Sequence, residues 1–295
     1  MNETTNLDLG AIGNGTVGAL VDARGRIAWC CLPTFDGDPA FCSLLSPRDH
    51  DAGFFDIVLD NHVDTTQRYL DNSAVLATRL DAADGSTIEI VDFAPRYKAH
   101  GRIFHPMSLV RTIRPLAGTP RITLRLRPLA DYGARVPERT SGSNHLRFLL
   151  GDTVLRATTD VPLPMLRDEL PFLLERDMHV VLGPDETFAD APSAYARGAL
   201  ESTLDYWHEW VRYLSIPAEW QDAVIRAAIT LKLCQYEGTG AIVAALTTSI
   251  PEAPHTVRNW DYRYCWLRDA AFVVRALNRL GATRSMEEYL RYLFN

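Results

Sequence analysis

The hydrophobic period of this 295-residue sequence changes once, near residue 193. Before that point, short apolar runs recur at near-regular spacing between turn residues. After it, apolar residues recur every three or four positions. A run of strands followed by a run of helices indicates that β and α structure lie in separate domains. Two domains are also the usual arrangement for a chain of this length.

The first part of the chain is predicted to form an antiparallel β-sandwich. Residues 11–31 and 74–93 each have the pattern of a hairpin, the second with an Asp-Gly turn between two apolar runs. Residues 32–41, with their Pro and Asp-Gly punctuation, are predicted to form a loop.

One strand shows which residues should face the core. In residues 121–127, Ile122, Leu124 and Leu126 alternate with Arg and Thr side chains. An antiparallel sheet commonly buries one face and exposes the other, so we expect these arginines to form a solvated outer face. Trp29 is expected in the sandwich core, with contact to the later helices through an N-terminal loop as the alternative for Trp29 and Phe35.

The second part is predicted to be helical. An amphipathic helix should cover 193–214 and end before Pro217, because the residue before a proline is disfavoured in helix. A helix over 219–236 should bury one stripe, made of Trp220, Val224, Ala227, Ala228 and Leu231. The helix over 267–280 is apolar almost all round and should be buried, ending at Gly281. Residues 285–288 have the form of a capping box that starts a last helix.

The predicted domains are therefore three. Residues 1–192 form the antiparallel β-sandwich, residues 193–216 form a linker helix, and residues 217–295 form a second, helical domain.

A string of twelve residues, RNWDYRYCWLRD (258–269), has a composition that suits sugar binding. It holds two Trp, two Tyr, three Arg and two Asp. Aromatic faces pack on the C–H faces of a pyranose, and charged groups form strong hydrogen bonds to its hydroxyls. Trp, Tyr and Arg are also enriched at packed protein interfaces, so composition alone leaves that alternative open.

The order of these residues resembles the glucoamylase-like inverting glycoside hydrolases of family 15, which include bacterial glucoamylases, glucodextranases and a trehalase branch. Tyr262, Trp266, Arg268 and Asp269 match the family's Tyr-x-x-x-Trp-x-Arg-Asp string. Residues 247–261 and 11–41 also look like bacterial members of this group. The resemblance implies a trehalase-like N-terminal β-sandwich followed by the first helices of an (α/α)6 barrel, incomplete in this chain.

The same resemblance implies an exo-acting, inverting α-glucoside hydrolase without metal or cofactor. Its substrate would be an α-glucan oligosaccharide, from which it releases glucose, or trehalose, which it splits. Asp269 would bind hydroxyls of the terminal glucose with Arg268 beside it, Tyr262 would lie near the reacting carbon, and Trp266 would support the surroundings of the acid. Trp260 and Arg258 are candidates for the rim of the site.

No catalytic residue is assigned in this chain. Inversion needs a general acid and a general base about 6.5–9.5 Å apart. Asp269 with Glu237, or with Asp261, has the residue types, but the resemblance places both catalytic Glu residues beyond Asn295.

Structural roles remain as alternatives for the candidate residues. Arg268 and Asp269 can form an ion pair at a helix start, where the helix dipole favours the carboxylate. Trp266 can belong to the core, and Tyr262 can lie in an interface.

The length of the helical part predicts a fragment. Six helix pairs need at least about 200 residues, and 78 residues follow Pro217. We expect an N-terminal portion of a longer enzyme that is inactive in isolation. Helices 219–236 and 267–280 would then offer apolar surface to a partner chain or to self-association. The alternative is a non-catalytic carbohydrate-binding or docking fragment that needs a partner chain to complete the barrel.

Composition argues against several other classes. A formal charge of −7 disfavours a nucleic-acid partner, and no apolar run approaches the ~20 residues that span a membrane. The polar start is unlike a signal peptide, so a cytoplasmic location is expected. Neither the five Cys nor the eight His have metal-ligand spacing, so we expect no metal.

Overall fold

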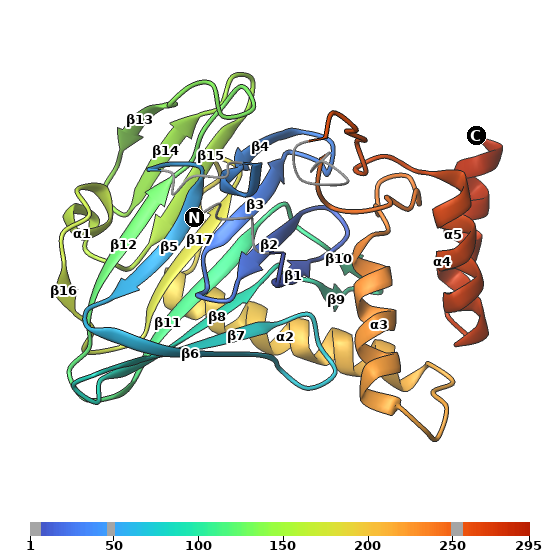
Figure 1. Cartoon of the computed structure of the whole chain (residues 1–295), viewed down its shortest axis with the longest axis horizontal. Coiled ribbons are helices and arrows are strands. Elements are labelled where there is room, and N and C mark those ends of the chain that lie inside the picture. Colours follow the sequence, from blue (N-terminus) through green and yellow to red (C-terminus); the bar gives the residue numbers. More distant parts are fainter. Residues whose placement is uncertain (1–6, 46–50, 249–255) are drawn as a thin grey trace.

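The computed structural model describes residues 7–45, 51–248 and 256–295. Two large antiparallel sheets form the first part of the chain, and helices follow (Figure 1). The strands are β1 (Leu9–Gly13), β2 (Gly18–Asp22), β3 (Ile27–Leu32), β4 (Asp38–Phe41), β5 (Phe54–Leu59), β6 (His62–Tyr69), β7 (Leu76–Ala82), β8 (Thr87–Phe93), β9 (Tyr97–Ala99), β10 (Arg102–Phe104), β11 (Leu109–Ala117), β12 (Arg121–Arg127), β13 (Glu138–Ser141), β14 (His145–Leu149), β15 (Val154–Thr159), β16 (Phe172–Leu173) and β17 (Met178–Gly183). The helices are α1 (Leu163–Arg167), α2 (Pro192–Arg212), α3 (Gln221–Leu233), α4 (Leu267–Arg279) and α5 (Thr283–Phe294), with a short 3-10 turn at Ser43–Leu45.

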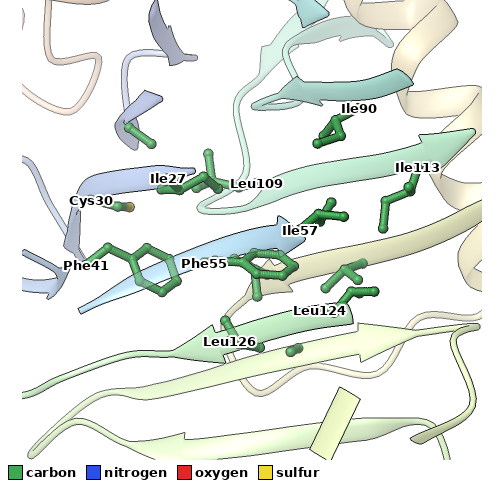
Figure 2. Close-up of a cluster of buried hydrophobic side chains, with 14 of the residues drawn as sticks. Ile27, Cys30, Phe41, Phe55, Ile57, Ile90, Leu109, Ile113, Leu124 and Leu126 are labelled. Atoms are coloured by element: carbon green, nitrogen blue, oxygen red, sulfur yellow. The ribbon is translucent and has the colours of Figure 1, made fainter. Parts of the chain in front are cut away.

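The two sheets share one core. One sheet has the order β1-β2-β3-β5-β12-β16 with β4 beside β3, and the other runs β13-β14-β15-β17-β11-β8-β7-β6. Figure 2 shows side chains of both sheets pointing into the space between them, with Phe55, Ile57 and Leu124 from one and Ile90 and Ile113 from the other. The predicted antiparallel β architecture is confirmed.

The alternation in β12 is also confirmed. Ile122, Leu124 and Leu126 are buried, and the arginines on the other face are partly or fully exposed. That outer face is not bare, because Arg125 and Arg127 pair with Asp56 and Glu169. Alternating side chains on a half-buried strand therefore identified the core face correctly.

Two β predictions need correction. The hairpin predicted for residues 11–31 contains a second turn, which separates β1 from β2. In this turn the Asn14 side chain accepts hydrogen bonds from the backbone N–H groups of Thr16 and Val17, as in an Asx turn. The predicted loop 32–41 contains β4, which pairs with β3. A turn closed by Gly37 N–H to Thr34 C=O returns the chain to the free edge of β3.

Helix α2 covers the outer face of the second sheet (Figure 1). Its Ala196 and Ala199 pack on Val91, Phe93, Val110 and Val181 of the sheet and on Val75, which directly precedes β7. Further along the same helix, Tyr206 and Trp207 pack against Ile229 and Leu233 of α3. One face of α2 therefore contacts both the sheet and the helix that follows.

The predicted buried stripe of the second helix is largely wrong: of its members, only Ala228 is fully buried, and Val224 and Leu231 are half-buried. Trp220 lies before α3, with a positive φ of 60°, and is exposed together with Ala227. The residues that α3 buries are Ala228, Ile229, Lys232 and Leu233. The aromatic side chains of α2 determine which face of α3 is buried. The spacing of apolar residues within α3 does not reveal this.

The prediction that the helix after Trp266 is buried is also wrong. Only Ala270 and Leu277 of α4 are buried, and Phe272 is 65% exposed. In the described part of the chain, α4 contacts α5 and α3, and Figure 1 shows α4 and α5 side by side at the edge of the molecule. An apolar composition buries a helix only where neighbours cover every face.

The end of α4 is as predicted, but the start of α5 is not. Gly281 follows α4 with a φ of +81°, the left-handed conformation that ends many helices. Helix α5 begins at Thr283 after Ala282, without a side-chain cap, so Ser285 is a buried residue inside the helix and the capping-box prediction fails. None of the helices in the described ranges is long and apolar enough to cross a membrane.

Candidate functional site

The candidate string 258–269 reaches α4 along an extended segment. The backbone N–H groups of Ala244 and Ala245 donate to the carbonyls of Tyr264 and Tyr262, at 3.2 and 2.9 Å, and Val243 pairs with Cys265. Residues 249–255, part of the segment 247–261 that resembles the bacterial members, lie outside the described residues. The string is therefore held by the extended segment that follows α3.

That extended segment is in turn held by the β-sandwich. The Trp29 indole N–H donates to the carbonyl of Leu246 at 2.6 Å, and Phe35 packs with Val243 and Leu246. Trp29 is fully buried, but in a cluster with Ala28, Cys31, Cys42 and Leu44 that is separate from the core between the two sheets. The sandwich-core expectation for Trp29 is therefore wrong, and its indole instead contacts the segment beside the string.

Three aromatic side chains of the string lie together. The centroid of the Trp266 ring lies 6.1 Å from that of Trp260, with the two rings nearly perpendicular. It lies 5.7 Å from the centroid of the Tyr262 ring, at an interplanar angle of 37°. The Trp266 indole N–H donates to the carbonyl of Asp261 at 3.0 Å, which fixes its ring. Tyr262 and Trp266 are half-buried, and Trp260 is exposed. We refer to Trp260, Tyr262 and Trp266 as the aromatic platform.

The two charged candidates occupy the first turn of α4. A guanidinium nitrogen of Arg268 lies 3.2 Å from a carboxylate oxygen of Asp269, and their side chains are 74% and 39% exposed. Exposed pairs of this kind contribute little to stability. The ion pair that the structural alternative predicts is therefore present, and both side chains remain accessible to a ligand. Arg258 is also exposed.

The sequence interpretation missed Arg263, which lies in the middle of the same string. Its side chain is almost fully buried, pairs with Asp261 at 2.9 Å and donates to the carbonyl of Gly37 at 2.6 Å. The sequence shows Arg263 between two tyrosines, which could have marked it as a candidate. Its partners outside the string are more than 100 residues away in the sequence, so the sequence alone does not show what Arg263 binds.

Neither Glu237 nor Asp261, the two other carboxylates considered from the sequence, has the environment of a general acid. Burial alone acts to raise the pKa of Glu237, but attraction first to Arg96 and then to Lys232 outweighs it and lowers that pKa to about 2. Burial also acts to raise the pKa of Asp261, and its hydrogen bonds to Arg263 give a net lowering. A general acid needs a pKa near the working pH, so both groups are held as carboxylates. In the described ranges no three His, Cys, Asp or Glu side chains cluster as metal ligands would.

Two protein-family models match this chain in succession. The model described as "Trehalase-like, N-terminal" matches residues 3–154, and the model "Glycosyl hydrolases family 15" matches residues 218–295. The chain belongs to the trehalase branch of glycosyl hydrolase family 15. The resemblance read from the string at 258–269 is thereby confirmed at the level of the family.

Curated relatives in this family are trehalases. The chain is 30% identical to a trehalase of Thermoplasma volcanium over 290 residues, which cover 95% of this chain and 46% of the relative. It is 28% identical to a trehalase of Mycobacterium tuberculosis, covering 93% and 44%, respectively, and 30% identical to trehalase 1 of Sulfolobus acidocaldarius, covering 97% and 48%. The chain spans about half the length of the curated relatives it matches.

Proposed function

We propose that this chain is the part of a trehalose-splitting glycoside hydrolase that binds the terminal glucose. The observation that carries the proposal is the accessible pair of Arg268 and Asp269 in the turn directly after the aromatic platform. A pyranose needs both kinds of group, because its C–H faces pack on rings and its hydroxyls bond to charged side chains. The trehalase relatives support trehalose over longer α-glucans as substrate.

In this proposal, Asp269 accepts hydrogen bonds from glucose hydroxyls and Arg268 donates to their oxygens. Tyr262 places its oxygen near the anomeric carbon, where positive charge develops in the transition state. Trp266 and Trp260 pack on the sugar, and Arg258 lies at the rim. Inversion requires two carboxyl groups on opposite sides of the scissile bond, and we assign neither of them to this chain.

We further propose that residues 217–295 begin an (α/α)6 barrel, joined to the sandwich (1–192) by the helix at 193–216. Support comes from the family 15 match over 218–295 and from the exposed apolar side chains of α4, such as Leu267 and Phe272.

The test is glucose release from trehalose and from maltotriose by the natural gene product that carries this chain. We expect hydrolysis of trehalose, with the β anomer of glucose as one initial product, and a loss of about 100-fold or more in kcat/KM for Asp269→Asn. Glu287→Gln, which changes an exposed carboxylate on α5, is the matched control. We expect the 295-residue chain alone to release no glucose; release by that chain would refute the assignment of the catalytic carboxyl groups elsewhere.

A non-catalytic docking fragment is the second candidate. The favouring observation is the exposed apolar surface of α4 and α5, which includes Leu267, Phe272, Leu293 and Phe294. A docking module should be monodisperse alone and bind one defined partner, whereas an open barrel fragment should self-associate. Sedimentation velocity of the 295-residue chain separates the two.

A further inference from the structure

Arg263 is the side chain that joins the candidate string to the β-sandwich. Its Nη1 donates to the carbonyl of Gly37 at 2.6 Å and to the sulfur of Cys31 at 3.6 Å. Its Nη2 donates to the hydroxyl of Tyr132 at 3.3 Å. All three partners belong to the β part of the chain: Cys31 is in β3, Gly37 precedes β4, and Tyr132 follows β12.

The other edge of the same guanidinium is bound to the string. Nε and Nη2 contact both carboxylate oxygens of Asp261, at 2.9–3.3 Å, and the Arg263 backbone N–H donates to the same carboxylate at 3.0 Å. Only 3% of the Arg263 side chain is exposed. Such a planar, bidentate contact fixes direction as well as distance.

Asp261 carries this orientation to the aromatic platform. Its side chain is held by Arg263, while its backbone carbonyl accepts the indole N–H of Trp266 at 3.0 Å. The Trp266 ring contacts both Trp260 and Tyr262. A continuous series of hydrogen bonds therefore runs from the turn before β4 to the rings that we assign to sugar binding.

We propose that Arg263 is a positioning residue through which the β-sandwich sets the geometry of the aromatic platform for the sugar. The inference rests on the proposed function for its role in catalysis, but its structural part stands on the contacts of Arg263. Lysine at this position would keep the charge and lose the fork that binds Asp261, Gly37 and Tyr132 together.

Arg263→Lys is the central variant, and Arg79→Lys is its matched control. Arg79 also makes a bidentate contact to an aspartate two residues away, Asp81, but on the surface of the sandwich. The first readout is the circular dichroism couplet of the Trp260 and Trp266 rings in the 295-residue chain, identified by its loss in Trp260→Phe. We expect Arg263→Lys to lose this couplet and Arg79→Lys to keep it.

The second readout is kinetic, with trehalose and the natural gene product. Displacement of binding groups by about 1 Å can cost roughly 100-fold in kcat/KM, and we expect Arg263→Lys to show such a loss with a raised KM. A variant that is only partly unfolded would lower the apparent kcat and leave KM unchanged. If Arg263→Lys keeps both the couplet and the wild-type KM, the inference is overturned.

A milder variant covers the case in which Arg263→Lys does not fold. Tyr132→Phe removes one acceptor of Arg263 from an exposed loop residue, and we expect a weakened couplet and a raised KM. A folded Tyr132→Phe with both unchanged would overturn the inference in that case. If the wild-type gene product does not hydrolyse trehalose, the proposed function fails, and the couplet still decides whether Arg263 positions the platform.

Discussion

The carboxylate of Glu237 accepts a hydrogen bond from the guanidinium of Arg96 at 2.6 Å, in the contact between the β-sandwich and the helices. Both side chains are almost completely buried, and Lys232 of α3 lies 3.0 Å from the same carboxylate. Arg96 also donates to the backbone carbonyl of Asn14 and stacks on the ring of Tyr206 in α2. One buried ionic cluster therefore links the first hairpin, α2 and α3.

Removal of this carboxylate should destabilise the chain strongly. Glu237→Gln leaves Arg96 and Lys232 buried without their main counter-charge, and such a loss costs about 3–5 kcal/mol. The measurement is the free energy of unfolding from urea denaturation. Glu209→Gln is the control, because Glu209 pairs with Lys98 at the same 2.6 Å on the surface and should change stability little. Equal decreases in the free energy of unfolding for the two substitutions would show that burial of the ion pair does not matter for its contribution to stability.

The same cluster predicts a dependence of stability on pH. The pKa of Glu237 is about 2 in the folded chain, against an ordinary value of 4.5. A carboxyl group with a lowered pKa stabilises the fold above its ordinary pKa and loses this effect as the pH falls toward the folded value. The full contribution is roughly 3 kcal/mol, and roughly 2 kcal/mol of it should disappear by about pH 3.

Comparison of wild type with Glu237→Gln isolates this contribution from the other carboxylates. Urea denaturation at about pH 6 and about pH 3 should give a stability difference between the two proteins that shrinks on acidification. A difference that stays constant would mean that Glu237 does not titrate in this range.

Two glycines should respond to alanine in opposite directions. Gly281 has a φ of +81°, which an alanine adopts only with strain, so Gly281→Ala should cost about 1 kcal/mol or more. Gly198 lies within α2 with open space where a Cβ would stand, so Gly198→Ala should stabilise by about 0.5–1 kcal/mol. Midpoints of thermal unfolding of both variants provide the measurement; the same sign for both would contradict the assigned backbone conformations.

The two faces of the sandwich should differ in their tolerance of truncation. Leu124 is fully buried between the sheets, and Leu124→Ala should cost about 2–5 kcal/mol. Val58 of β5 is 37% exposed, and Val58→Ala should cost about 1 kcal/mol or less. Chemical denaturation of the two variants checks this; similar costs would mean that Leu124 does not lie in a close-packed core.

The sequence allowed the β architecture to be predicted because strand burial follows a local rule. The alternation of Ile122, Leu124 and Leu126 is set by the pleat of their own strand. The strand β4 was missed because its pairing depends on a turn at Gly37 that returns it to β3, which the Pro and Asp-Gly signals alone do not specify.

The helices show where local pattern becomes insufficient. The stripe on α3 was misplaced because Tyr206 and Trp207 of α2 decide which side faces inward. The burial of α4 was overestimated because composition reports what a helix can bury and says nothing of what lies beside it. Arg263 was missed for a related reason: its partners Gly37, Cys31 and Tyr132 are distant in the sequence and are brought together only by folding.

The candidate residues in the string were identified from a motif, and the structure shows which of their side chains are exposed to a ligand. The contact of Arg268 with Asp269 was foreseen as the structural alternative, and their exposure could not be read from the sequence. The platform formed by Trp260, Tyr262 and Trp266 depends on the Asp261 carbonyl and on Arg263, neither of which the motif includes.

Asp269 binds the terminal glucose of trehalose in the function that we propose. The most direct measurement is kcat/KM for trehalose in the natural gene product, compared between Asp269→Asn and the exposed control Glu287→Gln. We expect a loss of about 100-fold or more for Asp269→Asn at unchanged thermal stability, and wild-type activity for Glu287→Gln. Wild-type kcat/KM in a folded Asp269→Asn enzyme would contradict it.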